Sequence, residues 1–157
     1  MQVTVRDAEL PDVPAVLTLM AELAEHEGLR QYLTLTPELL ARFALQEPKR
    51  FHVVVATADD AVVGYATYIF QFHLWTAREY LYLDDLYVAS SHRGQGVGAK
   101  LMDRVAAIAV ERDVDAGWHV ELANRHAQDF YTALGAELRD RFTAYWSREA
   151  MRARLAR

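Results

Sequence analysis

A glycine-rich turn between a strand-like and a helix-like segment constrains this chain most. Residues 93–98 read Arg-Gly-Gln-Gly-Val-Gly, and residues 80–89 before them are rich in apolar residues. After the turn, apolar residues recur at helical spacing as far as about Asp113, at Val97, Leu101, Val105 and Ile108. Alternate glycines expose consecutive backbone N–H groups, and the following helix adds the positive end of its dipole. The pattern predicts a phosphate-binding turn.

Two other phosphate-binding loops do not fit these residues. A Walker loop needs Gly directly before Lys and Ser or Thr, whereas Gly98 is followed by Ala99-Lys100-Leu101. The dinucleotide-binding loop needs a different glycine spacing. For the glycines alone, a turn that only connects a strand to a helix remains the alternative.

The first half of the chain predicts a strand, two helices and a hairpin. Residues 3–5 alternate as a strand, and the apolar spacing over residues 13–24 predicts a helix. Thr36 and Pro37 are the N-cap and first residue of a second helix, which ends before Pro48. Two β-rich segments joined by Asp59-Asp60 then predict an antiparallel hairpin, residues 51–56 and 62–70.

The second half predicts a third strand at residues 80–89, the helix after the turn, and a further strand at residues 118–122. A helix over residues 127–134 follows, with Gly135 as its C-terminal cap. Phe142, Ala144 and Trp146 alternate as a last strand, and residues 149–157 form a short helix or a frayed tail. We expect a single α/β domain over residues 1–157, with a mixed sheet and helices on its faces.

Composition excludes several classes of protein. The 157 residues include no cysteine, which excludes disulfides, a thiolate nucleophile and a cysteine-rich zinc site. The six histidines lack metal-ligand spacing, so we expect no metal. No signal peptide and no membrane-spanning run is present, which predicts a cytoplasmic protein that does not bind membranes. A net charge of −5 argues against nucleic acid and suits a cationic substrate, or solubility alone.

Several motifs together resemble the GNAT superfamily of N-acetyltransferases. Residues 93–98 match its Q/R-x-x-G-x-G/A acetyl-CoA signature, and residues 81–88 resemble its fourth strand. The later residues resemble its N…FY…GA segment, namely Asn124, Phe130, Tyr131, Gly135 and Ala136. The resemblance implies the GNAT fold, a mixed and mostly antiparallel central sheet with a splayed strand pair, flanked by helices on both faces.

Within the superfamily the chain looks like the diamine branch of spermidine/spermine and thialysine acetyltransferases. The similarity includes Tyr68-x-x-x-Phe72-x-x-Trp75, Leu-Asp-Asp-Leu at residues 83–86 and Ala-Val-Glu-Arg at residues 109–112. Three positions depart from the branch, where Asp84 replaces Glu, Ala123 replaces Trp and His126 replaces Pro. These departures leave the exact amine open.

The resemblance implies acetyl-CoA as the acetyl donor. A backbone N–H of the family's fourth strand stabilises the thioester carbonyl, and the slot between that strand and residues 118–122 holds pantetheine. Carried onto this sequence, the donor-binding residues are Leu86, Tyr87, Val88, Arg93, Gly94, Gln95, Gly96, Val97, Gly98, Asn124 and Tyr131.

The acceptor amine needs a base. An amine with a pKa near ~10.4 is almost wholly protonated at pH 7, and deprotonating it costs roughly 4–5 kcal/mol. Asp84 and Asp85 lie in an apolar strand, where a regular pleat would send them to opposite faces. The resemblance implies a bulge at this point of the strand, which would re-aim their side chains. The resemblance makes Asp84 the base or the amine anchor, with Asp85 as a structural or substrate-binding residue. A salt-bridged edge pair is the alternative for both.

The resemblance also implies the remaining site residues. Tyr131 is expected to protonate the departing thiolate, although it also fits the apolar stripe of its helix. Glu27, in the acidic stretch with Glu22 and Glu25, matches the substrate-contacting region of polyamine enzymes, with a solvated helix face as the alternative. Trp75 and Tyr82 are expected to line the substrate channel, unless they belong to the core.

The sequence therefore leaves three functions open. The first is acetylation of a small cationic amine by direct attack, and the second is acetylation of protein lysines or N-termini. The third is a non-catalytic module that binds acyl-CoA. Relatives in the diamine branch are homodimers with paired or exchanged C-terminal strands, so Tyr145 and Trp146 are candidate interface residues.

Overall fold

The computed structural model describes residues 2–140 and 143–156. They fall into two compact units, one ending at His119 and one beginning at Val120, and each unit is described by itself. The prediction of a single domain therefore stays a prediction.

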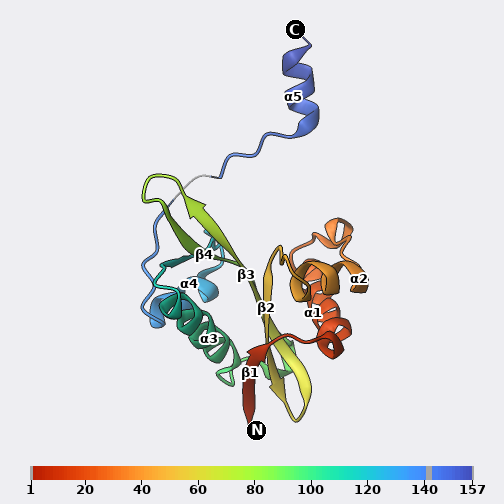
Figure 1. Cartoon of the computed structure of the whole chain (residues 1–157), viewed down its shortest axis with the longest axis vertical. Helices are drawn as coiled ribbons and strands as arrows, with labels where there is room; N and C mark the ends of the chain where they lie inside the picture. The colour runs from red at the N-terminus through yellow and green to blue at the C-terminus, as the bar shows by residue number, and fades with distance from the viewer. Residues whose placement is uncertain (1, 141–142, 157) are drawn as a thin grey trace. The chain divides into compact units, whose positions relative to one another are not determined.

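The first unit is built on a five-stranded sheet (Figure 1). Its strands are β1 (Val3–Asp7), β2 (His52–Ala58), β3 (Ala61–His73), β4 (Arg78–Val88) and β5 (Ala116–Gly117). They lie in the order β1-β2-β3-β4-β5, with antiparallel pairs throughout except for the parallel pair β4 and β5. The predicted mixed, mostly antiparallel sheet is thus confirmed.

The helices begin close to the residues at which the sequence predicted them to start. They are α1 (Val13–His26), α2 (Pro37–Leu40), α3 (Val97–Glu111), α4 (Arg125–Ala133) and α5 (Arg148–Leu155), with single turns at Leu10–Asp12, Arg30–Tyr32, Ala41–Leu45 and Ser90–His92. Thr36 caps α2, since its hydroxyl oxygen accepts a hydrogen bond from the Leu39 backbone at 3.3 Å. The β2–β3 hairpin turns at Asp59 and Asp60, which both have positive φ.

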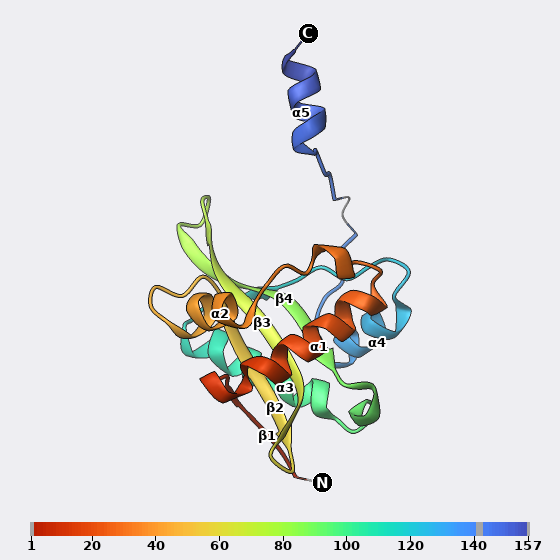
Figure 2. The same cartoon turned by 90° about the vertical axis from the view of Figure 1, so that its right-hand side faces the viewer.

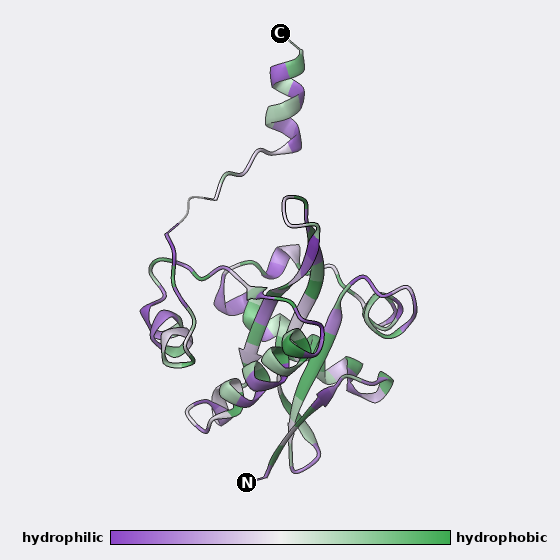
Figure 3. Cartoon of the chain, turned by 60° about the vertical axis from the view of Figure 1, so that its left-hand side comes forward, coloured by the Kyte–Doolittle hydropathy of each residue, from purple (hydrophilic) through white to green (hydrophobic). Residues whose placement is uncertain are grey.

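Helices cover both faces of the sheet in the first unit (Figures 1 and 2). The apolar side of α1 packs against β2 and β3 in a core of Val13, Val16, Leu19, Met20, Val53, Val55 and Tyr65. On the opposite face, α3 buries its own apolar side, made of Val97, Leu101, Met102, Val105 and Ile108. Figure 3 shows the resulting pattern, with hydrophobic central strands and helices that carry both hydrophilic and hydrophobic residues.

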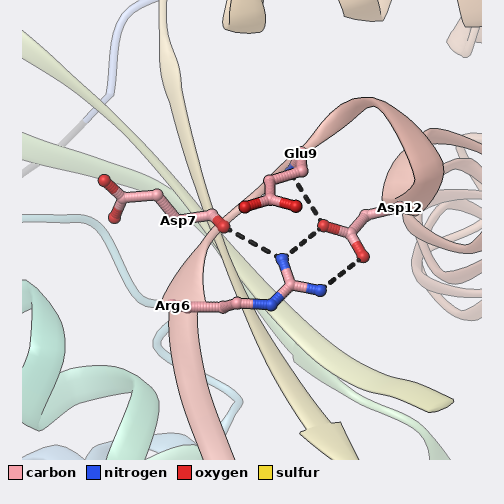
Figure 4. Close-up of polar contacts among 4 residues, drawn as sticks. All are labelled: Arg6, Asp7, Glu9 and Asp12. Carbon is pink, nitrogen blue, oxygen red and sulfur yellow. Dashed lines mark hydrogen bonds and ion pairs between the residues drawn. The ribbon is translucent and has the colours of Figure 1, made fainter. Parts of the chain in front are cut away.

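An ion pair joins β1 to the start of α1 (Figure 4). The Arg6 guanidinium donates to both carboxylate oxygens of Asp12, at 2.6 and 2.9 Å, and the Glu9 backbone donates to Asp12 at 2.7 Å. Asp12 is buried, and the Arg6 hydrogen bonds hold the pKa of its carboxyl below the ordinary value. The contact ties β1 to the residue that immediately precedes α1.

The predicted strand at residues 118–122 is wrong. Only Ala116 and Gly117 pair with β4, opposite Leu81 and Tyr82, and residues 118–121 have no regular structure. Leu122 is 64% exposed, so the apolar alternation does not bury that side chain. Alternation reports which side chains favour burial, but a strand also needs a neighbour that supplies hydrogen bonds. β5 therefore leaves β4 after two residue pairs, in line with the expected splayed strand pair.

The predicted last strand is also absent where the structure describes it. Residues 143–147 have no regular structure, and Phe142 lies outside the described residues. The side chains of Tyr145 and Trp146 are 89% and 61% exposed, so no other described segment buries them. The tail forms α5, which Ser147 caps through a hydrogen bond from the Ala150 backbone. No helix in residues 2–140 or 143–156 is long and apolar enough to cross a membrane.

Candidate active site

The pairing of β3 with β4 is irregular at Asp84. Tyr68 pairs with Leu83, and the next pair is Thr67 with Asp85, so Asp84 is an extra residue without a partner on β3. A bulge of this kind bends its strand and re-aims the side chains around it. The structure thus has a bulge at the position where the family resemblance led us to expect one.

The bulge places two carboxylates on one face of the sheet. Asp85 pairs with Thr67, and Tyr87 pairs with Tyr65, so these side chains share the face that α1 covers. Tyr82 pairs with Ile69 on this face, and Asp84, two residues after Tyr82, follows the same alternation. The charge of Asp84 also raises the pKa of Asp85 and of Tyr65. In a regular strand the two aspartates would face opposite sides. The face under α1 therefore gains a concentrated negative charge.

Asp85 is partly buried, whereas Asp84 is exposed. The Thr67 hydroxyl donates to Asp85 Oδ2 at 3.3 Å, and the Asp85 backbone N–H donates to the same hydroxyl at 3.1 Å. Burial, and next the charges of Asp84 and Glu27, raise the pKa of Asp85 to about 6, against the lowering effect of the Thr67 hydrogen bond. Near neutral pH Asp85 is therefore a stronger base than an ordinary carboxylate.

The Tyr65 hydroxyl lies on the same side of the sheet. Tyr65 is fully buried, and its hydroxyl has no hydrogen-bond partner in the described part of the chain. Burial raises the pKa of Tyr65, and the carboxylates of Asp85 and Glu27 raise it further. Its ring and that of Tyr87 are tilted neighbours with centroids 6.3 Å apart. The two rings give Asp85 a largely apolar surrounding within the sheet.

The end of α1 adds further acidic groups. Glu27 is the C-terminal cap residue of α1 and is exposed, and its charge acts on Asp85 and Tyr65. Glu22 instead accepts a hydrogen bond from the Tyr87 hydroxyl at 3.1 Å, which ties α1 to β4. Of the exposed glutamates in this stretch, Glu27 is thus the one whose charge raises the pKa of Asp85.

The structure brings Tyr82 to this cluster but leaves Trp75 away from it. Tyr82 pairs with Ile69, one register position before the bulge, and burial followed by the charge of Asp84 raises its pKa. Its hydroxyl is 3.0 Å from Nδ1 of His119. Trp75 lies in the turn at the far end of the β3–β4 hairpin, is 94% exposed and packs against His73.

The glycine-rich turn connects the end of β4 to α3. Gly94 and Gly96 have φ angles of 72° and 78°, and no atom lies within 4 Å of where a Cβ would stand on either residue. Gly96 is the N-cap residue of α3, and no side chain caps that end. The first N–H groups of a helix have no partner within it, so those of Val97 and Gly98 face the turn. The turn thus has the open backbone and free donors that a phosphate needs.

Arg93 and Gln95 hold the turn in place. The Arg93 guanidinium donates from Nε to the Val88 carbonyl at 2.9 Å and lies over the Tyr87 ring, 5.1 Å from its centroid. The Gln95 amide donates to the Ser91 carbonyl at 3.0 Å. The side chains of these two residues therefore stabilise the turn, while its backbone stays exposed.

Among the residues that the structure describes, no strand pairs with the other edge of β4 apart from β5 at Leu81 and Tyr82. The Ala89 N–H donates to the Val63 carbonyl at 2.9 Å, so Ala89 and Tyr87 direct their backbone groups toward β3. Because backbone groups alternate along a strand, those of Leu86 and Val88 point to the opposite edge. The Val88 carbonyl accepts from Arg93 on that side. Of the three strand residues predicted to contact the donor, Leu86 and Val88 thus offer outward N–H groups.

The second unit contains Asn124 and Tyr131. Asn124 caps α4, because its side-chain oxygen accepts a hydrogen bond from the Ala127 backbone at 3.1 Å, and its amide nitrogen remains a donor. Tyr131 is buried with 9% exposure, its ring centroid is 5.2 Å from that of Phe130, and burial raises its pKa. α4 ends before Gly135, which has a φ of 92°. The predicted helix and its glycine cap are confirmed.

Sequence reasoning missed three residues of the acidic cluster. Thr67 and Tyr65 share a face with Asp85 only because of the register that the bulge sets, although a threonine in an apolar strand was a usable signal. The sequence pattern could not distinguish Tyr65 from an ordinary aromatic residue of the hydrophobic core. His119, two residues after β5, contacts the Tyr82 hydroxyl through its side chain, and nothing in the local sequence indicates that contact.

Comparisons with known proteins agree with this geometry. The sequence profile described as the acetyltransferase (GNAT) family matches residues 16–136. A bovine (Bos taurus) thialysine N-epsilon-acetyltransferase is 35% identical over 147 residues, covering 86% of this chain and 84% of that protein. A human (Homo sapiens) spermidine/spermine N(1)-acetyltransferase-like protein 1 is 31% identical over 140 residues, covering 84% of this chain and 20% of that longer protein.

Among solved structures, an integron cassette protein from the mobile metagenome of V. cholerae superimposes with a TM-score of 0.76 at 25% identity. The match covers 98% of both chains.

The raised pKa of Asp85 predicts a specific pH dependence of stability. A carboxyl whose folded pKa exceeds its unfolded value stabilises the fold below the unfolded pKa, and this contribution is lost as pH rises through the folded pKa. For Asp85 the interval runs from about 3.8 to about 6. Asp85→Asn should therefore increase the free energy of unfolding at pH 8 by roughly 1–2 kcal/mol relative to the wild type.

Urea denaturation at pH 4 to 8 measures this difference. The stability gain of Asp85→Asn should vanish near pH 4. The control is Asp60→Asn in the exposed β2–β3 turn, where asparagine also tolerates a positive φ, and this variant should show no comparable gain in stability. A constant difference between Asp85→Asn and the wild type across this range would contradict the raised pKa.

Proposed function

Since the chain belongs to the GNAT family of acetyltransferases, it is an acetyl-CoA-dependent N-acetyltransferase, and we propose that its acceptor is a primary amine of a small cationic molecule. The observation that carries the proposal is the acidic cluster under α1, where Asp84 lies beside Asp85 on the bulge and the charges of Asp84 and Glu27 raise the pKa of Asp85. The names of the relatives support the same class, so polyamines, thialysine and related amines are the candidates.

The donor side of the proposal rests on the turn between β4 and α3. Its backbone N–H groups and the start of α3 would hold the pyrophosphate of acetyl-CoA, and their open surroundings fit such a group. The outward N–H groups of Leu86 and Val88 would bind the pantetheine arm and the thioester carbonyl, where negative charge develops. The amide nitrogen of Asn124 would donate to the same arm.

The chemistry is direct attack of the amine on the thioester. A carboxylate of the cluster removes a proton from the ammonium, and Asp84 or Asp85 holds the charge of the acceptor. Tyr131 supplies a proton to the departing thiolate, and its raised pKa keeps the phenol protonated until that step. No metal takes part in this proposal, and no group of three or more His, Asp or Glu within the described ranges is placed to hold one.

Two other functions remain as outcomes of the test. Acetylation of protein lysines or N-termini would use the same donor site with a peptide acceptor. A module that binds acyl-CoA without turnover would keep the turn but would not need the cluster of Asp84, Asp85 and Glu27.

An amine panel tests the function. With acetyl-CoA, the protein should release CoA thiol with polyamines, thialysine or lysine-like amines at least tenfold faster than with neutral amines of equal size. The chain has no cysteine, so a thiol reagent reports CoA alone. Turnover with peptides but not with small amines would identify the acceptor as a protein amine. If neither class of acceptor gives thiol release, the protein is not an acetyltransferase for these amines.

A change of Gly96 tests the donor site. Gly96→Ala forces a side chain into a left-handed conformation, at a cost of roughly 1 kcal/mol, and should weaken CoA binding measured by calorimetry about tenfold. Gly28→Ala is the matched control, since Gly28 has a similar φ of 69° and equally open surroundings outside the turn. Equal CoA affinity in the two variants would argue against the turn as the binding site.

A change of Tyr131 tests the proposed acid. Tyr131→Phe keeps the buried ring and removes only the hydroxyl, so kcat should fall by roughly 10²-fold while KM for acetyl-CoA changes little. The neighbouring Phe130→Leu is the packing control. An unchanged kcat in Tyr131→Phe would remove this residue from the mechanism.

We also propose that the protein is cytoplasmic and forms a homodimer. The exposure of Tyr145 and Trp146 supports an interface at the C-terminal segment. Light scattering should give twice the chain mass, and replacing both residues by serine should lower it. A monomeric mass for the wild type would contradict the dimer.

A further inference from the structure

We propose that His119, oriented by Tyr82, binds a carboxylate at the far end of the acceptor, so that the acceptor is an amino acid with a side-chain amine and not a polyamine. The assignment rests on the proposed function and narrows its substrate class. His119 then determines specificity, because it contacts the part of the acceptor that does not react.

Tyr82 lies next to the acidic cluster on the same face of the sheet. It pairs with Ile69, whereas Asp85 pairs with Thr67, so the two positions are two residues of β3 apart. Burial, followed by the charge of Asp84, raises the pKa of Tyr82. The phenol therefore keeps its proton at neutral pH and can act as a hydrogen-bond donor.

The contact between Tyr82 and His119 selects one tautomer of the imidazole. The Tyr82 hydroxyl is 3.0 Å from Nδ1 of His119, and the two rings are edge-to-face neighbours with centroids 5.7 Å apart. When the phenol donates to Nδ1, the neutral imidazole carries its own proton on Nε2. His119 is exposed, and Nε2 has no hydrogen-bond partner among the residues that the structure describes. The Nε2–H group is therefore available to a ligand.

The backbone of β5 leaves room beside this donor. Gly117 pairs with Tyr82, and paired residues of neighbouring strands direct their side chains to the same face. No atom lies within 4 Å of where a Cβ on Gly117 would stand. The side of Tyr82 on which β5 lies is therefore open, and an acceptor can lie there without displacing a side chain.

The charges along this face change away from the acidic cluster. Beyond Tyr82, two residue pairs of β3 and β4 share the face, Gln71 with Tyr80 and His73 with Arg78. Neither pair contains a carboxylate, and Glu79 lies on the opposite face because side chains alternate along a strand. On these two strands a second ammonium would meet no acidic side chain beyond Tyr82. A carboxylate would instead find the N–H of His119, with Arg78 further along.

The spacing of the two groups fits a lysine-like amino acid. In extended lysine or thialysine, about 7–8 Å separate the side-chain nitrogen from the carboxyl carbon. The step along the sheet from the Thr67–Asp85 pair to the Ile69–Tyr82 pair is of similar length, about 7 Å. With its reactive amine at the aspartates, such a molecule places its carboxylate beside Tyr82 and His119.

Matched acceptors test the assignment. Thialysine and its carboxamide share the reactive amine and the α-amine and differ in the carboxylate alone. The wild type should show a kcat/KM for thialysine about tenfold above that for the carboxamide, measured by release of CoA thiol, because a charge-assisted hydrogen bond is lost. A diamine of equal length, which has no carboxylate, should be used no better than the carboxamide.

Variants of His119 test the residue. His119→Phe keeps a ring beside Tyr82 but removes both nitrogens, so the ratio of the two kcat/KM values should fall to about one. His119→Gln places an amide N–H near the position of Nε2 and should keep part of the preference. His73→Phe is the matched control, since His73 is exposed on the same face but about 20 Å along β3 from Thr67, beyond the reach of the molecule. This control should keep the wild-type ratio.

The outcomes separate this assignment from the function itself. A wild-type ratio near one, or a preference for the diamine, would overturn the carboxylate site. A ratio that stays at its wild-type value in His119→Phe would overturn the role of His119. A wild type that binds CoA but turns over no amine would instead remove the proposed function, and the assignment with it.

Discussion

The extra residue in β4 is the constraint on which the acceptor site depends. A β-strand sends successive side chains to opposite faces, so two adjacent aspartates would normally be separated by the sheet. The register shift between Thr67 and Tyr68 removes that separation and places Asp84 and Asp85 on the face under α1. The same shift aligns Asp85 with Thr67, which supplies its hydrogen bonds.

In the proposed reaction, β4 would contact both substrates through different parts of one strand. Its face carries the carboxylates, its open edge presents the N–H groups of Leu86 and Val88, and its end leads into the turn at residues 93–98. In this proposal side chains form the acceptor side, because a small cation is recognised by charge. Backbone groups would form the donor side, because a diphosphate and a thioester carbonyl both accept hydrogen bonds. Arg93 connects the two sides, since it bonds Val88 and covers Tyr87.

The site is less stable than the sheet could be. A partly buried carboxylate with a raised pKa costs free energy that an apolar residue would not, and so does the buried Tyr65 hydroxyl, which has no hydrogen-bond partner among the described residues. Two hydrogen bonds tie α1 to the sheet on this side, from Tyr87 to Glu22 and from Arg6 to Asp12. Local instability of this kind is common where a protein needs a group in an unfavourable state.

The sequence by itself determined the elements whose signals are local. The turn at residues 93–98, the Thr36 cap, the Asp59-Asp60 hairpin and the helix that ends at Gly135 follow from residues within one or two turns of each other. Tertiary structure decided what depends on a neighbouring strand. Alternation at residues 118–122 found no partner beyond Gly117. The surroundings of Asp85 depend on the β3–β4 register, which brings it to Thr67, 18 residues earlier. Side-chain pattern records a preference for burial, whereas pairing and register depend on hydrogen bonds that distant segments supply.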